Sequence, residues 1–556
     1  MTDINFLITV PRFSKKGEYY SFPFGLAYIS SYLKSKGFNI FCVNLCHYPE
    51  NQTTKEILEQ WIKEKNISVI LTGGMSGHWD LIDDVINTAK KIKPEITTVA
   101  GGPLVTADPE LAMDNMKLDY GIIGEGEITA GELAFALSQN KSIENIRGII
   151  YRKENKLCCN NEQPPILDLD SLPFPDYESL GYDEWIELMK YSGQNPVLEN
   201  YDVVRYSPII GSRSCPFSCT FCYHPLGKVY RQRSLDNIFK EIDFLIDKYG
   251  SNFISFQDEL FSVNHERMYE CADRIKRYNI KWEAQFRVNN VTRDMLKRLK
   301  ESNLHYMGFG VENISDKILK SMKKMITKAE IENAFKLAYE EKIFCSGNIL
   351  LGDPEDTVET MDESIEWWKK HQHYNISLIF IKTIPDSPDY QYAIKNNIIK
   401  DKLKYVRNNF PIVNLTKIPD KQFNQIKKEV WGYRKSLKYV LDAELINSEK
   451  LPEKYSTNNY YSLTTACPAC NHTDKYKAFM KTMTKYQTLN CKNCYARIKI
   501  EQKKAFYDEY NLFKMISNKY LQRFYVFLLK KEYVKPDNKF IIVIKKYTKK
   551  LLKKAD

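Results

Sequence analysis

Strand-like and helix-like segments alternate along most of this chain, and that alternation constrains its fold more than any other feature. In the first 145 residues, buried strand-like runs such as Ile4–Val10 and Ser68–Thr72 are each followed by a helix-like run. Several of these strands run into glycines, which are Gly73, Gly74, Gly101, Gly102, Gly124 and Gly126. Such repeats predict an α/β domain over residues 1–145 with a doubly wound, Rossmann-like sheet, in which ligands bind at the carboxyl ends of the strands.

A second set of six repeats begins near residue 205. Its strand candidates are residues 207–210, 253–256, 282–286, 306–310, 346–351 and 377–381. Six repeats predict a partial, TIM-like (β/α)6 barrel over residues 201–420, with its site at the carboxyl ends of the strands. Residues 146–200 contain two proline-rich runs and are expected to form an irregular connector. Residues 421–556 are expected to form a small C-terminal region that is helical at first.

Three cysteines follow the first strand of the second set. Cys215, Cys219 and Cys222 have the spacing C-x3-C-x2-C. Thiolates are the ligands that iron–sulfur clusters require, and three of them can hold a 4Fe–4S cluster while its fourth iron stays open to a substrate. The alternative is a group of buried small side chains or a partial zinc site.

The later strands end in residues suited to a zwitterionic nucleoside ligand. In chain order these residues are Asp258, Glu259, Arg287, Glu312, Gly347 and Gly352, and Phe221 precedes them inside the cysteine run. The first two carboxylates can accept hydrogen bonds from an ammonium group, and the arginine can hold a carboxylate. The third carboxylate suits ribose hydroxyls, the glycines permit close approach of a flat base, and the phenylalanine can pack beside a cluster or an adenine. Taken singly, each polar residue is equally explained by a surface salt bridge.

Taken together, the cysteines and the strand-end residues resemble the core of the radical S-adenosylmethionine (SAM) enzymes over about residues 205–400. The resemblance implies that the open iron binds the amino and carboxyl groups of SAM. One electron, from a donor of the flavodoxin or ferredoxin type, then cleaves SAM to methionine and a 5′-deoxyadenosyl radical. Asp258-Glu259 stands where Gly-Gly-Glu is commoner in the family, so which of the two carboxylates binds the ammonium group stays open.

Residues 1–145 resemble the cobalamin-binding domain that precedes such cores. The matching segments are Phe22–Tyr28 with Gly25, Gly101–Pro103, and Ile123–Glu127 with Gly124, Glu125 and Gly126. In this family such loops line the corrin and its nucleotide tail. The motif Asp-x-His-x-x-Gly is absent, so the resemblance implies base-off cobalamin without a histidine ligand on cobalt. The domain could also be a relic without the cofactor.

Two C-x2-C pairs lie near the C-terminus. Cys467 with Cys470, and Cys491 with Cys494, are separated by 20 residues. Four thiolates at this spacing predict a zinc ribbon with a structural Zn²⁺ over about residues 461–500. An auxiliary iron–sulfur cluster is the main alternative.

Net charge and composition limit the kinds of partner and the cellular location that the sequence predicts. The net charge is +11, and residues 501–556 contain 15 basic and 6 acidic residues, so most of the excess lies in this tail. A basic tail can meet nucleic acid or simply form a solvated face. We see neither a secretory signal nor a membrane span. With thirteen cysteines, the sequence therefore predicts a cytoplasmic protein whose cysteines are metal ligands or free thiols.

The resemblance implies a methyltransferase that uses SAM twice, once to methylate cobalamin and once to form the radical. Its substrate would be a natural product or peptide, methylated at an unactivated carbon or phosphorus. One alternative is radical ring contraction or cyclisation without methyl transfer. Another is an RNA-modifying or nucleic-acid-binding protein that uses the ribbon and the basic tail.

Overall fold

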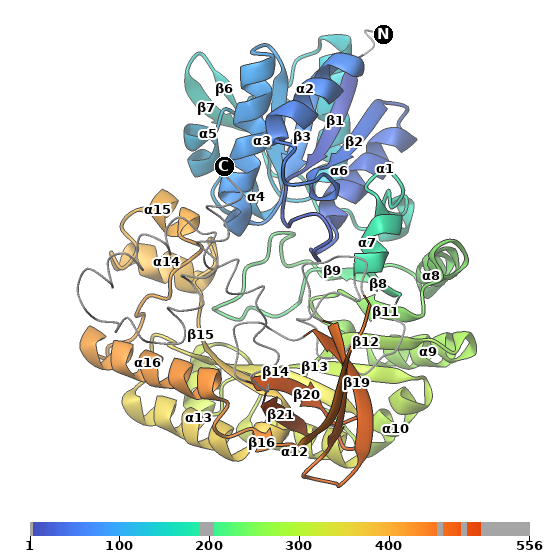
Figure 1. Cartoon of the computed structure of the whole chain (residues 1–556). Coiled ribbons are helices and arrows are strands. Elements are labelled where there is room, and N and C mark those ends of the chain that lie inside the picture. The colour runs from blue at the N-terminus through green and yellow to red at the C-terminus, as the bar shows by residue number, and fades with distance from the viewer. Residues whose placement is uncertain (1–3, 189–204, 453–459, 480–485, 502–556) are drawn as a thin grey trace, which may run out of the picture.

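The computed structural model describes residues 4–188, 205–452, 460–479 and 486–501. The basic tail, apart from Glu501, lies outside these residues. Within them, none of the helices combines the length and the apolar character that crossing a membrane requires. The described residues form an upper α/β unit, a partial barrel below it, and a β-rich C-terminal part (Figure 1).

The first unit is a doubly wound sheet, as predicted. Its parallel strands are ordered β2-β1-β3-β4-β5, and the hairpin β6-β7 extends the sheet. The strands are β1 (Asn5–Val10), β2 (Asn39–Asn44), β3 (Ile67–Gly73), β4 (Thr97–Gly101), β5 (Tyr120–Ile122), β6 (Ile149–Lys153) and β7 (Lys156–Cys159). The helices are α1 (Phe24–Ser35), α2 (Thr54–Glu64), α3 (Trp79–Ile92), α4 (Pro103–Ala107), α5 (Pro109–Asn115) and α6 (Gly126–Gln139).

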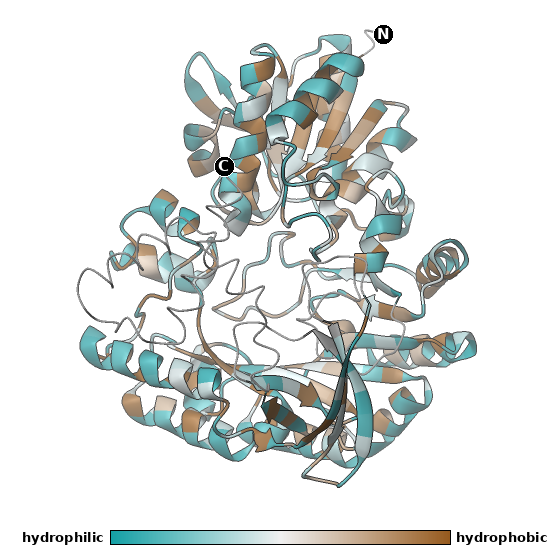
Figure 2. Cartoon of the chain, viewed as in Figure 1, coloured by the Kyte–Doolittle hydropathy of each residue, from teal (hydrophilic) through white to brown (hydrophobic). Residues whose placement is uncertain are grey.

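Alternation along β1 explains the two helical layers of this unit. Phe6 and Ile8 pack with Leu26 of α1 and Leu133 of α6, whereas Leu7 packs on the other face with Ile57 of α2 and its neighbours. Successive side chains of a strand point to opposite faces, so a strand covered on both faces is apolar throughout. Figure 2 shows this as brown strands behind helices with teal outer faces.

The connector is more regular than expected. The sheet does not end near residue 145, because β6 and β7 continue it in antiparallel fashion to Cys159. Helix α7 (Tyr182–Leu188) follows the proline-rich runs. Tyr177, Tyr182 and Trp185 of this segment are almost fully buried. They join the two units, because Trp185 donates to the Tyr20 carbonyl at 2.7 Å and Tyr182 donates to Ser207 at 2.8 Å.

The second unit is the predicted partial barrel. Six parallel strands are ordered β15-β14-β13-β12-β11-β8, and the two outer strands do not pair with each other in the described chain. The strands are β8 (Tyr206–Ile209), β11 (Phe253–Phe256), β12 (Lys281–Phe286), β13 (Leu304–Glu312), β14 (Phe344–Leu351) and β15 (Ile376–Phe380). The outer helices are α8 (Leu235–Tyr249), α9 (His265–Ile275), α10 (Arg293–Glu301), α11 (Asp316–Ser321), α12 (Lys328–Glu340) and α13 (Val358–Lys370).

The described chain after the barrel begins with helices and continues with strands. Helices α14 (Pro388–Lys395), α15 (Lys402–Arg407) and α16 (Asp420–Ser436) are followed by strands in the described part. These strands are β16 (Leu441–Asp442), β17 (Leu445–Lys450), β18 (Tyr460–Ala466), β19 (Thr473–Phe479), β20 (Tyr486–Asn490) and β21 (Arg497–Glu501). In the described part of residues 421–501, the expected helical start is α16, and strands follow it.

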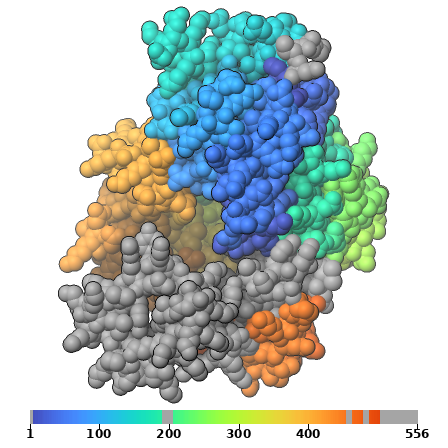
Figure 3. All heavy atoms as spheres, turned by 45° about the horizontal axis from the view of Figure 1, so that its top comes forward, coloured from blue at the N-terminus to red at the C-terminus, as the bar shows by residue number. Residues whose placement is uncertain are grey.

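The carboxyl ends of the two parallel sheets face each other. Glu127 follows β5 of the first unit and is bonded to Arg213, which follows β8 of the barrel. A second contact joins α15 to α3, where Arg407 lies 3.1 Å from Asp80. Figure 3 shows the first unit, in blue to teal, against the green and light-orange parts of the chain that follow it. Ligand sites of the two sheets therefore lie on facing edges.

Candidate active site

The cysteine run connects β8 to the hairpin of β9 (Ser212–Arg213) and β10 (Arg231–Gln232). Cys219 is buried, and Cys215 and Cys222 are half-buried. Burial raises the pKa of all three thiols, and that of Cys222 reaches about 12. A bound iron would take them as thiolates and hold that form. Sulfur ligands that are shielded from water and close enough to affect one another's pKa fit the donor set of an iron–sulfur cluster.

The partial-zinc alternative fits the triad poorly. Among the described residues, only the C-terminal cysteines place three or more ligand atoms within 4.8 Å of one another. The sulfurs of Cys215, Cys219 and Cys222 therefore do not all lie within 4.8 Å of one another. Ligands of three separate irons must be spread in this way, because each cysteine binds its own corner of the cluster.

The two adjacent acids after β11 have different surroundings. Asp258 is buried, and it accepts hydrogen bonds from the Gly211 amide at 2.6 Å and from the Ser212 amide and hydroxyl at 3.1 and 2.7 Å. It therefore holds the backbone that leads into the cysteine run. Glu259 is exposed, and its charge raises the pKa of Cys215 and Cys222. Of the two carboxylates, only that of Glu259 is left to face a ligand beside the cysteines.

Arg287 braces the cysteine run. Its guanidinium lies 3.7 Å from the centre of the Phe217 ring and donates to the carbonyls of Lys324 and Met325. Glu312 accepts from Lys324 at 3.0 Å. Both predicted residues therefore lie at the cysteines, as their effects on the pKa of Cys219 show. Their bonds to the protein, however, support the loop around the triad rather than leave the groups free.

The remaining predicted residues of the barrel, Gly347, Gly352 and Phe221, lie in three different surroundings. A side chain at Gly347 would clash with Val311 and Phe309 of β13, so this glycine permits close strand packing. Gly352 turns the chain after β14 with a φ of +99°, and its amide donates to Asp356 at 2.8 Å. Phe221 packs in an apolar cluster with residues of α11 and α14. These three residues therefore have structural surroundings, and their contacts leave none of them facing an open space.

A polar barrel interior was missed by sequence reasoning. Glu283 of β12 accepts from Tyr206 at 2.8 Å and from Ser255 at 2.7 Å, while its second carboxylate oxygen has no partner. Burial raises its pKa. Gln285, two positions further along the same strand face, is exposed. Barrel interiors are usually filled by branched apolar residues, so this face is suited to a polar ligand. The alternation of Trp282, Ala284 and Phe286 with the polar Glu283 and Gln285 is the sequence feature that indicates this polar face.

The glycines of the first unit gather at its carboxyl edge. Gly73 and Gly101 are paired neighbours on β3 and β4, and an added Cβ on Gly73 would lie 2.7 Å from the Gly101 carbonyl oxygen. Gly102 has a φ of +79° and packs on Gly74. The space around Gly25, Gly124 and Gly126, the last of which begins α6, differs from one glycine to the next. A Cβ would meet no atom within 4 Å at Gly25 and Gly124, whereas at Gly126 it would clash with Ile29. The backbone is thus closely packed at Gly73, Gly102 and Gly126, and the space beside Gly25 and Gly124 is open, which fits a flat ring such as a corrin.

Glu125 has a different neighbour from the one expected. It is 6% exposed and lies 2.5 Å from Arg231, and its other oxygen accepts from the Ile166 amide at 2.7 Å. Arg213 pairs with Glu127 at 2.5 Å. The sequence predicted a contact between Glu125 and a cofactor, but both of its oxygens are held by the protein. We call Glu125, Glu127, Arg213 and Arg231 the interunit clamp.

Two histidines, His47 and His78, lie near the ends of strands in the first unit, and their surroundings differ. His47 accepts from or donates to the Tyr20 hydroxyl at 2.8 Å and lies against α7. His78 lies beside Gly74, its ring centre is 4.4 Å from that of Phe13, and its buried Nδ1 has no partner. Met75, 53% exposed, stands at the same edge. This exposed apolar side chain adds to the fit for a ring ligand, and no sequence pattern marked it.

The C-terminal cysteines form a compact tetrad. The sulfur of Cys467 lies 3.7 Å from that of Cys494, and the sulfur of Cys470 lies 3.6 Å from that of Cys491. Zn–S bonds of about 2.3 Å in a tetrahedron place the sulfurs about 3.8 Å apart. The four sulfurs are therefore arranged to bind one tetrahedral metal ion.

A buried acid beside the barrel gives a pH-dependent prediction. Asp389 is 3% exposed, its Oδ2 has no partner, and burial followed by the charge of Asp353 raises its pKa to about 6. As the pH rises from about 4 to 6, the unfolded chain releases this proton first, so stability falls through that window. We expect Asp389→Asn to stabilise the protein by on the order of 2 kcal/mol at pH 7, with no gain below pH 4.

Thermal unfolding midpoints of the variant and the parent between pH 4 and 7 test this prediction. Asp294→Asn, at an exposed position on α10, is the control and should follow the parent at every pH. A gain that is the same at all pH values would show that the charge of Asp389 is not its cause.

Comparison with known proteins agrees with this architecture. The Radical SAM superfamily matches residues 209–367, and the B12 binding domain matches residues 15–134. An uncharacterized methyltransferase of Pyrococcus horikoshii is 30% identical over 383 residues, which span 68% of this chain and 79% of that protein. The anaerobic magnesium-protoporphyrin IX monomethyl ester cyclase of Cereibacter sphaeroides is 25% identical, over 62% of this chain and 55% of its own length.

A solved structure shares the fold. It is the radical SAM methyltransferase TsrM of Kitasatospora setae, solved with cobalamin and a [4Fe-4S] cluster, with a TM-score of 0.57, 15% identity, and coverage of 70% of this chain and 75% of that one. The domain matches span both units, and the facing sheet edges carry the cysteine run on one side and the glycines on the other. The chain therefore belongs to the radical SAM enzymes that carry a B12-binding domain.

Proposed function

We propose that this enzyme is a cobalamin-dependent methyltransferase that modifies an unactivated carbon or phosphorus of a small molecule or peptide. The observation that carries the proposal is the facing of the two sheet edges. The interunit clamp holds the glycine edge of the first unit opposite the cysteine run of the barrel. A methyl group held at one edge can reach a substrate activated at the other only if the edges face each other.

Different residues of the chain would have different roles in this reaction. Cys215, Cys219 and Cys222 would hold the cluster, and Glu259 would accept a hydrogen bond from the ammonium group of SAM. Arg287 and Glu312 keep the cysteine run in place. Gly25, Gly73, Gly74, Gly101, Gly102 and Gly124 would line the corrin. When bound, the cluster with SAM supplies an organic radical, and cobalamin supplies the methyl group.

The barrel interior favours a polar substrate. Glu283 and Gln285 lie on one face of β12 and offer a carboxylate and an amide. An apolar substrate would leave the second carboxylate oxygen of Glu283 without a partner and would cover the exposed Gln285 amide, and unpaired buried polar groups are costly. A substrate with hydrogen-bond donors therefore fits this interior better than a hydrocarbon.

Product analysis tests the proposal. The protein, reconstituted with iron, sulfide and hydroxocobalamin, is incubated with trideuteromethyl SAM, titanium(III) citrate and a metabolite extract of its host. We expect both S-adenosylhomocysteine and 5′-deoxyadenosine, together with a product that carries the labelled methyl group. Formation of 5′-deoxyadenosine without S-adenosylhomocysteine or a labelled product would overturn methyl transfer. That result would favour a radical cyclisation, which is the reaction named for the magnesium-protoporphyrin relative.

The cysteine tetrad has a structural role in this proposal. The ribbon lies at the amino ends of the barrel strands, where Tyr495 stacks on Phe344 of β14 and its carbonyl accepts from Asn375 at 3.2 Å. This end is opposite to the edge that carries the cysteine run. A closed site of four cysteines holds zinc without an open position for chemistry.

Removing one cysteine of the tetrad should release this metal. We expect Cys494→Ser to lose one equivalent of zinc and to unfold at a lower temperature, because metal binding and folding of such units are coupled. Iron bound at the other cysteines should be retained. Metal analysis and thermal unfolding measure both effects, with Cys159→Ser, at an exposed cysteine, as the control. Retention of zinc, or iron in its place, would contradict a zinc ribbon.

A further inference from the structure

Glu283 of β12 is a buried carboxylate without a charged partner in the described chain. It is 7% exposed, and the hydroxyls of Tyr206 and Ser255 both donate to its Oε1, at 2.8 and 2.7 Å. Its Oε2 is buried and accepts no hydrogen bond from a described residue. Burial raises the pKa of Glu283, the two hydrogen bonds oppose this shift, and no charge of a described residue contributes to it. Such a group needs a proton or a cation, because an isolated buried charge is costly.

Three tyrosines lie close to this carboxylate. Burial raises the pKa of Tyr19, Tyr206 and Tyr306, and the negative charge of Glu283 raises each of them further. Tyr206 and Tyr306 come from strands β8 and β13 of the barrel, whereas Tyr19 comes from the loop between β1 and α1 of the first unit. Aromatic rings attract cations. A buried carboxylate with tyrosine rings near it therefore suits a cationic group.

The barrel interior on the carboxyl side of Glu283 is polar and open. Gln285 lies two residues further along the inward face of β12, and its side chain crosses Gly308, where an added Cβ would clash with it. Gln257, just after β11, and Asn348 of β14 are exposed like Gln285. Three exposed amides thus lie between Glu283 and the carboxyl ends of the strands. A molecule whose charged end reaches Glu283 would have its other end near the cysteine run.

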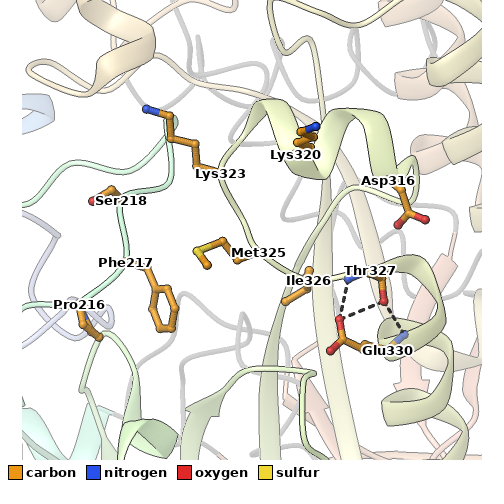
Figure 4. A pocket seen from close by; sticks show the side chains of 10 residues that line it. All are labelled: Pro216, Phe217, Ser218, Asp316, Lys320, Lys323, Met325, Ile326, Thr327 and Glu330. Carbon is orange, nitrogen blue, oxygen red and sulfur yellow. Dashed lines mark hydrogen bonds between the residues drawn. The ribbon is translucent and has the colours of Figure 1, made fainter.

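The surface pocket beside the cysteine run lacks such a preference for one charge. It measures about 770 Å³ and lies between Pro216–Ser218 and residues of the stretch 316–330 (Figure 4). Its charged side chains are two acids and two lysines, which are Asp316, Glu330, Lys320 and Lys323. Charges of both signs select neither a cation nor an anion. The barrel interior differs, because the group that it leaves without a partner is a single carboxylate oxygen.

We propose that the substrate of this enzyme carries a cationic nitrogen, as an ammonium or guanidinium group, and that Glu283 binds this nitrogen in the barrel interior. The inference rests on the proposed function, because it names the substrate class for the same site. Oε2 of Glu283 accepts a hydrogen bond from the cation, and Oε1 keeps its two hydroxyl donors. Hydrogen bonds between charged groups are roughly twice as strong as neutral ones. A neutral analogue would leave the carboxylate without compensation, so the site discriminates against it.

Binding of two probes of nearly equal size tests this site in the reconstituted holoenzyme. Isothermal titration near neutral pH compares benzylammonium with benzyl alcohol, which lacks the charge. We expect the parent to bind benzylammonium about tenfold more tightly than the alcohol, and Glu283→Gln to lose this preference. Glutamine can still accept from Tyr206 and Ser255, and the iron content of this variant should equal that of the parent. Glu270→Gln, at an exposed acid of α9, is the control and should keep the preference.

Two results would contradict a cation site at Glu283. One is a parent protein that binds both probes equally or binds neither of them. The other is a preference that survives in Glu283→Gln, and its loss in Glu259→Gln would then place the ammonium group beside the cysteines.

The product assay separates this inference from the proposed function. A labelled product that contains a basic nitrogen supports both. A labelled product without a basic nitrogen keeps methyl transfer and overturns the substrate class. If benzylammonium binds at Glu283 but no labelled product forms, the cation site stands and the proposed methyl transfer fails.

Discussion

Replacing Cys219 by alanine is expected to abolish the iron–sulfur absorption of the reconstituted protein and to reduce SAM cleavage to background. Cys219 is 8% exposed and contributes one of only three thiolates in the run. In the proposed site each thiolate would bind a different iron, so the remaining two would not hold the cluster in its place. The side chain removed is small, and Asp258 and Arg287 still hold the loop. We therefore expect the fold to persist while the chemistry is lost.

Iron content, visible absorption and the yield of 5′-deoxyadenosine measure this loss. Cys271→Ala is the matched control, because Cys271 is fully buried on α9 and has no part in the proposed site. It should lose some stability but keep its iron. Wild-type iron content in Cys219→Ala, with SAM still cleaved, would mean that the cluster has other ligands.

The second large effect is expected at the interunit clamp. Glu125→Gln leaves Arg231 and Arg213 buried without full compensation, and breaking a buried ion pair on one side costs about 3–5 kcal/mol. The three side chains are all less than a tenth exposed, so solvent screens them little. We expect the variant to unfold at a lower temperature and to be cleaved faster by protease at the segment that connects the two units.

A double variant separates the effect of charge from that of packing at this contact, and a variant at an exposed ion pair is the control. Glu125→Leu combined with Arg231→Met removes both charges and should recover part of the lost stability, because apolar side chains often replace a buried ion pair without loss. Glu178→Gln, at an exposed pair with Lys248, should behave like the parent. If Glu125→Gln were as stable as the parent, the clamp would contribute little to holding the units together.

The sequence was sufficient for features that are set locally. Strand and helix positions follow from apolar periodicity and from glycines, and the two cysteine motifs follow from spacing. The choice between Asp258 and Glu259 could not be predicted, because it depends on the amides of residues 211 and 212, which are distant in sequence. Glu125 was assigned to a cofactor for the same reason, since its partner Arg231 is distant in sequence. A charged side chain can bind a ligand or pair with another residue of the protein, and which of the two it does depends on its neighbours in the folded structure.

The β6–β7 hairpin was overlooked because the prolines after it dominated the interpretation of residues 146–200. Those prolines do interrupt regular structure, but only after Cys159. The polar barrel face was overlooked because Trp282, Ala284 and Phe286 alternate with Glu283 and Gln285. A strand that packs on helices with one face and lines an interior with the other resembles an ordinary half-buried strand.

One short loop belongs to both halves of the molecule. Gly124 borders the open space at the sheet edge, and the next residue, Glu125, is held by the barrel. Thermodynamic linkage follows from this arrangement, because any ligand that binds only when the loop is in place also favours the joined units. Binding of a corrinoid to the first unit and association of the two units are then thermodynamically coupled. An unfolding curve recorded with and without added corrinoid would report the affinity of the corrinoid site without any turnover.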